Sequence, residues 1–519
     1  MTHRSYILLT LLATLIPAAV RAQHMPGVAM GNYAGTQALY HNPAFVADSR
    51  YSVHVNLVGV QMFVANNHVK YNADYSFLNL MTNTVPDKYR NEKGGIILPL
   101  VDMVQKLNGN PKFMNLGVEA RLPSVMFSLK DGRYGIGLTS RVRTIANLSG
   151  VTEPLAQALR SRAKDQTIMR TTFENQRADM HLNLLGDLGL TLGGVVLDED
   201  TEMLKVGATV RRVIGLYNAY IQIDDGSFSI EPDPAFMNQK EFIRVPGINT
   251  RYGYTDGGSF QNFQFTPAWL LGNAPAGSGW GFDVGAVYEY RPDAYKYAYT
   301  ERGVRKLDPS KNKYLYRIAV SLTDIGRIRY KNPNYVRSYE AVATDKTFRF
   351  NDFQKLNGGQ NFFRGVNNSL GVDSTTTNGS YRTVLPTAFQ ASVDYQLKPN
   401  VYVNALWVQS LRTPGAFGAK AESVLALTPR YETRWYEVSV PVSIMNRYRS
   451  FNVGLAGRVG PLWFGTDHLT GLLNIGKPKM FNLYAGLSMG LYRQPPKSPN
   501  PCFFGNEESF WRRLFRKKF

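Results

Sequence analysis

The sequence predicts an all-β fold, a transmembrane antiparallel β-barrel of about 14 strands. Three observations indicate this fold. Apolar and polar residues alternate with a period of two in segment after segment, these segments are long, and both short turns and long polar segments separate them. Strands of globular proteins usually have about five to six residues, whereas a tilted strand needs about nine to eleven to cross a bilayer.

The alternation is clearest toward the C-terminus. Residues 481–491 place Phe, Leu, Ala, Leu, Met and Leu on one face and Asn, Tyr, Gly, Ser and Gly on the other. Residues 451–459, 436–444 and 314–323 divide in the same way, which predicts two-faced strands. Pro441 interrupts the polar face of one of them and predicts a bulge or bend.

The connections between the predicted strands have two different lengths. Asp-Gly at 131–132 and Lys-Pro-Asn at 398–400 predict tight hairpins. Long polar segments lie at 149–179, 232–279 and 331–384. Short turns at one end and long loops at the other are typical of outer-membrane barrels.

A secreted β-sandwich is the alternative, because its strands also alternate between a core face and a wet face. The predicted strands are too long for a sandwich. Their polar faces carry Gly, Ser and charges of both signs. Closure into a barrel would also remove the exposed edge strands of a large open sheet.

The composition agrees with a membrane barrel. The chain has 519 residues with 30 Tyr and 46 Gly, and its mean hydropathy is −0.25. Only alternate residues of a barrel strand face lipid, so the mean hydropathy stays low. No linker or repeat divides the chain, which predicts one large unit.

The N-terminus predicts export. Arg4 precedes an apolar run at 6–16, and small residues at Val20 and Ala22 predict cleavage of a signal peptide. We expect the mature chain in the outer membrane of a Gram-negative-type bacterium. The single cysteine, Cys502, excludes an internal disulfide. The predicted organisation is a signal peptide at 1–22, an N-terminal segment at 23–48, the barrel at 49–493, and a Pro-rich spacer with a basic aromatic tail at 494–519.

A corner precedes the first predicted strand. Pro43 fixes its own φ and moves Asn42 out of the helical region, so the chain turns at Asn42, Pro43 and Ala44 before the strand begins at Tyr51. An ordinary loop is the simplest interpretation, since Asn-Pro commonly initiates turns.

The chain resembles the outer-membrane barrels of the FadL type, the long-chain fatty-acid transporters, and the related PorV-type barrels of the type IX secretion system. The resemblance lies in residues 31–44, 122–143, 279–293 and 316–330, and it is nearest to an uncharacterised branch of that group. It implies a 14-stranded barrel whose N-terminal segment, here 23–48, fills the lumen as a hatch. No segment matches a fatty-acid pocket residue by residue.

The faces opposite the apolar ones carry charges of both signs, which we expect inside the barrel. Two interpretations remain open. Carboxylates and guanidinium groups can neutralise one another in a packed polar core, or the cations can line a path for anionic solutes such as fatty acids. Arg141 and Arg143 are the strongest candidates for such a path. The predicted lumen cluster comprises Arg133, Arg141, Arg143, Asp283, Glu289, Arg317 and Arg458.

The chain is strongly basic, with 59 Lys plus Arg against 39 Asp plus Glu and a net charge of +20. For an exported barrel this favours outer-membrane lipids and their anionic phosphates over nucleic acid as partners. The tail is expected to lie on a membrane surface as an amphipathic helix, or to be disordered. Its candidate membrane residues are Trp511, Arg512, Arg513, Phe515 and Arg516.

No catalytic or cofactor motif is present in the sequence. The histidines lack His-x-x-x-His spacing, and neither a Gly-x-Ser-x-Gly elbow nor a Walker loop occurs. His181 with Asp187 and His468 with Asp467 are the only fragments of a catalytic pair. We therefore predict no enzyme, no metal and no cofactor.

Three functional hypotheses follow. The first is a FadL-like channel for hydrophobic or amphipathic solutes, which predicts an apolar pocket beneath the long loops, a kink or gap in the wall and a movable hatch. The second is a PorV-like non-transporting barrel, a binding or scaffold component whose segments 232–279 and 331–384 hold a secretion or surface protein. The third is a surface enzyme with His and Ser at the rim.

Overall fold

The computed structural model describes most of the chain. The described residues are 25–92, 94–96, 103–161, 163–232, 241–261, 276–301, 303–349, 359–373, 375, 377–412, 417–445 and 448–495. The predicted signal peptide and the tail residues Trp511, Arg512, Arg513, Phe515 and Arg516 lie outside them.

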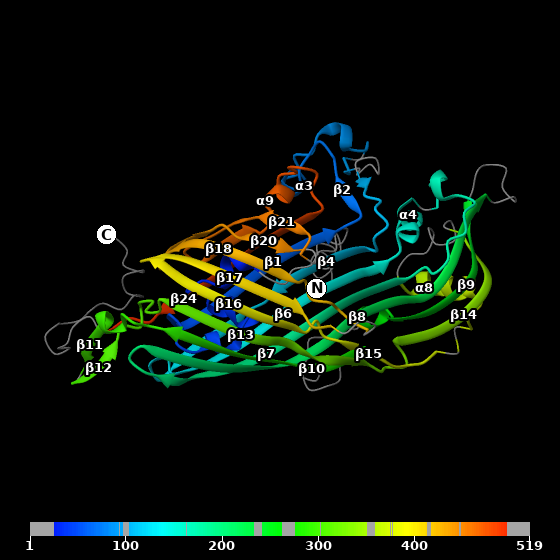
Figure 1. The fold of residues 1–519 in the computed structure, drawn as a ribbon. Helices are drawn as coiled ribbons and strands as arrows, with labels where there is room; N and C mark the ends of the chain where they lie inside the picture. Colours follow the sequence, from blue (N-terminus) through cyan, green and yellow to red (C-terminus); the bar gives the residue numbers. More distant parts are fainter. Residues whose placement is uncertain are drawn as a thin grey trace, which may run out of the picture.

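A closed antiparallel barrel of 14 strands forms the body of the molecule, as predicted (Figure 1). The last strand pairs with the first, Tyr492 opposite Tyr51, and closes the cylinder. Four of the 14 strands are interrupted and consist of two pieces. In order around the wall the strands are β1 (Tyr51–Asn66), β4/β5 (Lys112–Arg121, Ser124–Leu129), β6 (Tyr134–Val151), β7 (Ala178–Asp198), β8 (Glu202–Pro232), β10 (Gly277–Tyr290), β13 (Tyr316–Tyr330), β15/β16 (Tyr381–Val384, Ala388–Lys398), β17 (Val401–Ser410), β18 (Val424–Glu432), β19/β20 (Tyr436–Ser439, Val442–Met445), β21/β22 (Ser450–Val453, Leu455–Val459), β23 (Leu462–Thr466) and β24 (Met480–Tyr492).

Further elements lie in the N-terminal segment before β1 and in the connections between the strands. They are the strands β2 (Val69–Tyr71), β3 (Met103–Gln105), β9 (Glu241–Thr255), β11 (Ala298–Glu301), β12 (Val304–Leu307) and β14 (Val336–Phe348), the α-helices α2 (Pro26–Ala29), α3 (Phe77–Met81), α4 (Glu153–Ser161), α5 (Gly258–Gln261), α8 (Gly359–Leu370) and α9 (Leu469–Leu472), and the 3₁₀ turns η1 (Gly35–Tyr40), η2 (Pro43–Val46), η3 (Asp87–Tyr89), η5 (Lys130–Gly132), η6 (Gln166–Ile168) and η7 (Ala294–Tyr297). None of the described helices is long and apolar enough to cross a membrane.

The two ends of the barrel differ as predicted, except that one long connection, residues 291–315 with β11 and β12, lies at the end with the tight turns. At one end, on the left in Figure 1, tight hairpins join β5 to β6 and β16 to β17. Asp131, Gly132 and Asn400 take the positive φ that these turns need. The other end carries the long connections with α4 and α8. We call the two the short-turn end and the long-loop end.

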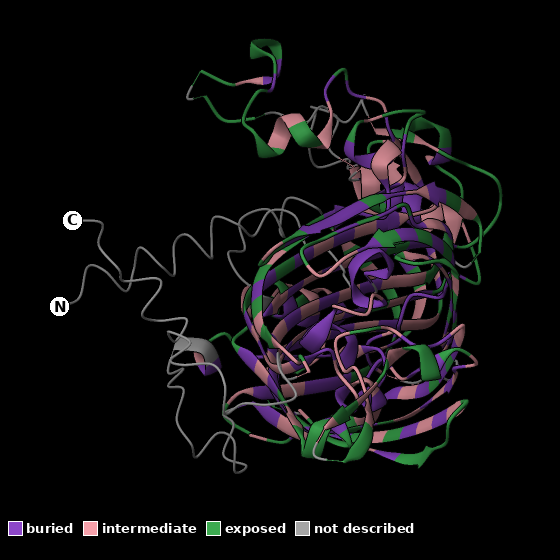
Figure 2. Cartoon of the chain, turned by 90° about the vertical axis from the view of Figure 1, so that its left-hand side faces the viewer, coloured by how far each residue is buried: buried purple, intermediate pink, exposed green. Residues whose placement is uncertain are grey.

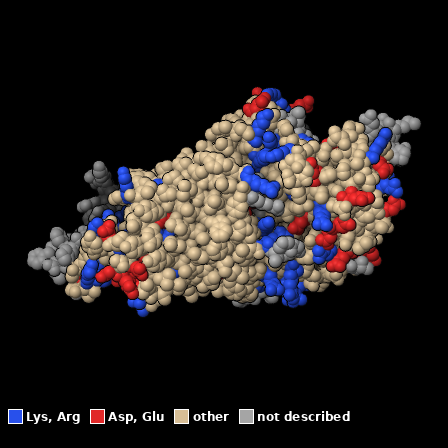
Figure 3. Space-filling view, viewed as in Figure 1, with Lys and Arg blue, Asp and Glu red and all other residues tan. Residues whose placement is uncertain are grey.

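An apolar belt encircles the outside of the barrel. Figure 3 shows a broad uncharged band between the charged ends. Alternate residues of each strand form it, and they include the exposed side chains of Leu190, Val206, Phe282 and Leu427. The alternation predicted for residues 481–491 holds through most of β24, because Leu487, Met489 and Leu491 are exposed and Ser488 is buried. Pro441 separates β19 from β20, which confirms the predicted bend.

Strand β8 is longer than the cylinder. The first half of β8, toward the short-turn end, pairs with β10 up to Gly215. From Ala219 the second half pairs with β9, which in turn pairs with β14. We call β9, β14 and this second half of β8 the flap. The flap and α8 occupy parts of segments 232–279 and 331–384, so the prediction of loops throughout these segments was wrong. Their Tyr-rich strands follow no simple apolar alternation.

The lipid exposure of the belt can be tested at Leu190. Replacing Leu190 by Arg puts a charge on the lipid face of β7 and should lower the free energy of unfolding by about 2–4 kcal/mol. Urea unfolding in lipid vesicles, followed by tryptophan fluorescence, measures the change. Leu190→Phe is the control and should have little effect. Equal stability of the Arg variant and wild type would contradict a lipid-facing belt.

Candidate functional site

The N-terminal segment fills the lumen near the short-turn end, where the resemblance placed a hatch. Residues of α2, η1 and η2 are almost all buried. Viewed from the short-turn end, buried segments lie inside the ring of strands (Figure 2). Contacts between η2 and the strands β7, β8 and β10 hold the segment against the wall. We call the described part, residues 25–48, the hatch.

The Asn-Pro-Ala corner anchors the hatch. The Asn42 side chain accepts a hydrogen bond from the Ala44 amide at 2.9 Å and donates to the carbonyls of Ala286 and Val320, at 3.1 and 3.0 Å. Pro43 occupies the first position of η2, where its missing N–H costs nothing. One side chain therefore caps a turn and joins the hatch to β10 and β13.

Glycines on the wall make room for this corner. A Cβ at Gly207 would lie 2.6 Å from backbone atoms of Pro43 and Ala44, and a Cβ at Gly285 would lie 2.2 Å from the Asn42 carboxamide oxygen. Distances below about 3 Å cannot be accommodated without movement, so β8 needs glycine at 207 and β10 needs glycine at 285 for the hatch to lie as it does.

Ion pairs occupy the middle of the lumen. Four arginines and four carboxylates from β4, β6, β7, β8, β10 and β13 meet in what we call the central cluster, so their charges balance. Arg141 lies 2.7 Å from Asp187, and Arg143 lies 2.7 Å from Asp324. Arg211 pairs with both Asp283 and Asp324. The members of the cluster are Glu119, Arg121, Arg141, Arg143, Asp187, Arg211, Asp283 and Asp324.

The central cluster also contacts the hatch. The Tyr40 ring lies between two of its guanidinium groups, 4.3 Å from that of Arg121 and 4.9 Å from that of Arg141. Arg121 also donates to the Gln37 side chain. The arginines thus bind carboxylates and the hatch together, which fits the packed polar core.

A second group of charges holds the base of the hatch. Asp48 pairs with Arg50 at 2.8 Å, Arg291 at 3.0 Å and Arg493 at 3.2 Å. Burial alone would raise the pKa of Asp48, but the guanidinium groups of Arg50 and Arg291 hold that pKa well below its usual range. Glu289 pairs with Arg291 and with Lys205 beside them.

A third group follows on the neighbouring strands β13 to β22, where Arg317 of β13 lies directly opposite Glu289 of β10 in the sheet. Arg317 pairs with Asp394 at 3.1 Å and donates to the Met30 carbonyl of the hatch at 3.0 Å. Arg458 lies 3.6 Å from Glu437. Six of the seven predicted lumen residues are therefore buried inside the barrel, although in separate groups. Arg133 is the exception, because it lies exposed in the β5–β6 turn before the strand begins.

The histidine fragments form no catalytic pair. His181 lies 2.6 Å from Asp179, and Asp187 is bound by Arg141 instead. His468 accepts from the Gly471 amide at 2.7 Å and starts α9. Among the described residues, no group of three or more His, Cys, Asp or Glu could hold a metal ion.

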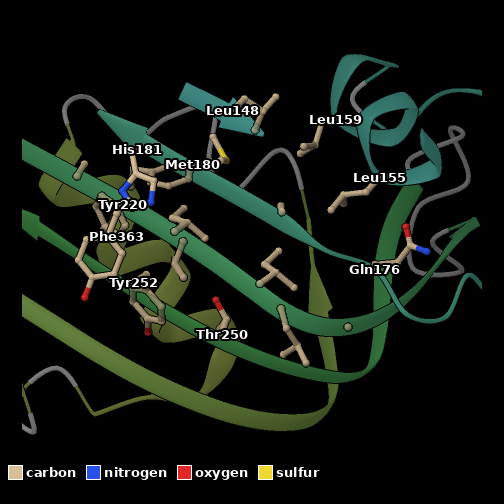
Figure 4. Close-up of a pocket in the computed structure, with 18 of the residues that line it drawn as sticks. Leu148, Leu155, Leu159, Gln176, Met180, His181, Tyr220, Thr250, Tyr252 and Phe363 are labelled. Carbon is tan, nitrogen blue, oxygen red and sulfur yellow. The ribbon is translucent and has the colours of Figure 1, made fainter. Parts of the chain in front are cut away.

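A large apolar cavity of about 750 Å³ lies at the long-loop end (Figure 4). Residues from α4 and α8 point into it, among them Leu155, Leu159 and Phe363. Gln176, Thr250 and His181 add a few polar atoms. The strand residues that line it include Leu116, Ala146, Leu148, Met180, Leu182, Ala219, Ile221, Ile223 and Tyr252.

The cavity lies on the outer face of the wall. Side chains two residues apart share a face, so Met180 and Leu182 share the face of Leu190 in the belt. Ala146 and Leu148 lie directly opposite Leu182 and Met180 on β6, and therefore face the same way. The apolar pocket of the channel hypothesis is thus present, but outside the lumen. Sequence reasoning missed it because its residues come from widely separated segments.

The fit between hatch and wall can be tested at a glycine. Gly207→Ala introduces a methyl group against the hatch backbone and should displace the hatch, which limited proteolysis near Gln37 would reveal as faster cleavage. Gly257→Ala is the control, since nothing lies within 4 Å of its added Cβ. Equal cleavage of the two variants would contradict the contact.

The buried charges can be tested at Asp324. Asp324→Asn leaves three arginines without a shared carboxylate and should lower the free energy of unfolding by about 3–5 kcal/mol. The exposed Asp345, which pairs with Arg244 at 3.2 Å, is the control. Both aspartates have positive φ, which Asn tolerates, and Asp345→Asn should cost less than ~1 kcal/mol. If urea unfolding showed similar losses of unfolding free energy for the two variants, the central cluster would contribute no more to stability than an exposed ion pair.

Comparison with known proteins gives one family match and several distant structural neighbours. No curated protein matches. The toluene transporter TbuX of Ralstonia pickettii shares 10% identity over 91% of this chain and 99% of its own, with a TM-score of 0.38. A FadL homologue of Pseudomonas aeruginosa shares 11% identity over 92% of this chain and 100% of its own, with a TM-score of 0.31.

The family match covers the hatch corner and most of the barrel. The model of a family of unknown function, DUF5723, matches residues 43–467. The chain therefore belongs to this family, DUF5723.

Proposed function

We propose that the protein is an outer-membrane channel of the FadL type that takes up hydrophobic or amphipathic solutes from outside the cell. In this proposal the long-loop end faces outward, as is general for outer-membrane barrels. The observation that carries it is the apolar cavity at that end.

The size and lining of the cavity suit such a solute. Ligand pockets for small molecules occupy roughly 300–1,000 Å³ and are mostly apolar with a few polar groups that orient the ligand. Here α4, α8 and the flap enclose about 750 Å³, and Gln176 and Thr250 are polar residues of the lining that lie on the outer face of the wall. Transfer of an acyl chain or an aromatic hydrocarbon from water into this cavity would lower the free energy by roughly 25 cal/mol per Å² of apolar surface buried.

Passage beyond the cavity requires the hatch to move. The hatch is held by hydrogen bonds such as those of Asn42 and by ion pairs such as those of Asp48. We propose that solute binding at the long-loop end is followed by partial release of these bonds. Because the cavity lies on the outer face of the wall, the solute would first have to pass through the wall or over its rim at the long-loop end, and the channel would then open within the lumen.

Filling the cavity tests the proposal. Ala146→Trp combined with Leu182→Trp adds bulk at two facing positions and should weaken binding of palmitate and of 1-N-phenylnaphthylamine by at least about tenfold. Fluorescence titration of the purified barrel measures affinity, and uptake of labelled palmitate by cells measures transport. Leu138→Trp, lower on the same face of β6, is the matched control. Unchanged binding in the double variant would sink the proposal.

A PorV-like binding or scaffold barrel is the second proposal. It is supported by the density of bonds between hatch and wall, and by an exposed apolar residue on the flap, Val342, which is 83% exposed. In this case a secretion or surface protein would dock on the flap and no solute would cross. Loss of a co-purifying protein on Val342→Glu, with palmitate uptake at the level of cells without the barrel, would favour it.

A further inference from the structure

Five side chains on four neighbouring strands form a basic aromatic patch. The patch lies at the edge of the belt that is nearer the long-loop end. Trp280 of β10 lies directly opposite Arg212 of β8 on one side and Arg327 of β13 on the other. Arg329 of β13 lies directly opposite Arg382 of β15. We call these five residues the arginine patch.

The arginine patch faces the lipid side of the wall. Phe282 lies two positions after Trp280 on β10, nearer the middle of the barrel wall. It lies directly opposite Val210 and Ile325, and no register shift occurs between this row of residues and the row of Trp280. Phe282 and Val210 are 45% and 44% exposed and belong to the belt. Since side chains two apart share a face, the patch continues this surface toward the long-loop end.

Three of the four arginines of the patch have no carboxylate partner among the residues that the structure describes. Arg327, Arg329 and Arg382 are exposed and carry no ion pair within the described ranges of the chain. Like charges directly opposite on neighbouring strands destabilise a sheet, and Arg329 and Arg382 stand in this relation.

One further guanidinium group is held in place by the aromatic ring. Arg212 lies 5.2 Å from the Trp280 ring and donates to the Gly279 carbonyl at 3.1 Å. The nearest carboxylates on these strands, Asp283 and Asp324, point into the lumen and bind Arg211 there. Around Trp280 the described outer surface therefore presents Arg327, Arg329 and Arg382 with no carboxylate beside them.

We propose that the arginine patch binds the phosphate group of a phosphorylated lipid of the outer leaflet. Arginine binds phosphate through paired charge-assisted hydrogen bonds, and tryptophan is favoured at the membrane interface. The acyl chains of the lipid would lie along Phe282 and Val210. This continuity with the belt is the reason for a lipid rather than a free anion. Figure 3 shows other Lys and Arg side chains along the same boundary of the belt.

The proposal is independent of the apolar cavity and is tested by lipid binding. The triple variant Arg327→Gln, Arg329→Gln and Arg382→Gln is compared with wild type by native mass spectrometry in detergent, with added bisphosphorylated lipid A. We expect the variant to bind it at least about tenfold more weakly. A control with the same change of charge at the short-turn end, Lys130→Gln, Arg133→Gln and Arg305→Gln, should bind as wild type does.

Three further measurements make the outcome decisive. Phosphate-free lipid A should bind weakly to every variant, and the triple Arg→Lys variant should retain part of the binding. Heat-modifiable migration in gels verifies that each variant is folded. Equal binding of wild type and the Gln variant, equal binding of phosphate-free lipid A, or displacement of the lipid by inorganic phosphate would each overturn the proposal.

Discussion

The width of a 14-strand barrel is the constraint on which the rest of the structure depends. About eight strands enclose a space that inward side chains can fill, whereas 16 to 18 leave a water-filled channel. The present barrel lies between these cases, and the hatch occupies the remaining space. Because buried charges are tolerated only when paired, each lumen arginine group needs a carboxylate on a neighbouring strand. Strand register and hatch position are consequently interdependent, as the bonds of Arg141 on β6 to Asp187 on β7 and of Arg121 to Gln37 of the hatch illustrate.

One extra residue in β8, a bulge at Leu216, determines which side chains of this strand face the lumen and which face the cavity. Below Gly215 the odd-numbered residues of β8 face inward, and above the bulge at Leu216 the even-numbered ones do. The bulge keeps β8 paired with β7 from Met203 to Ile223, while the other edge of β8 changes its partner from β10 to β9. The outer faces of Ala219 and Ile221 thus contribute to a pocket roofed by α4 and α8, so apolar and polar chemistry are kept on opposite faces of one wall.

Much of the wall could be predicted from the sequence, because an alternation with a period of two directly reports which face is buried. The hatch corner at Asn42 was found for a related reason, since proline restricts its neighbour whatever the fold. Asp324 was beyond this reasoning. The alternation over residues 314–323 predicts that the next residue faces lipid, but a bulge turns both Thr323 and Asp324 inward opposite Asp283. The flap was missed because its strands are rich in Tyr and polar residues, and the cavity because only pairing across β4 to β9 brings its lining together.

The contacts of Arg493 set an order of assembly. Arg493 follows β24 directly, and it binds both Asp48 at the end of the hatch and the carbonyl of Asp131 in the first hairpin. Asp48 therefore obtains all of its partners only after the final strand has paired with the first. A half-built barrel would hold its hatch with one guanidinium group missing, so the hatch becomes fully secured in the step that seals the wall. The ion pair between Arg493 and Asp48 therefore distinguishes a closed barrel from an incompletely assembled one.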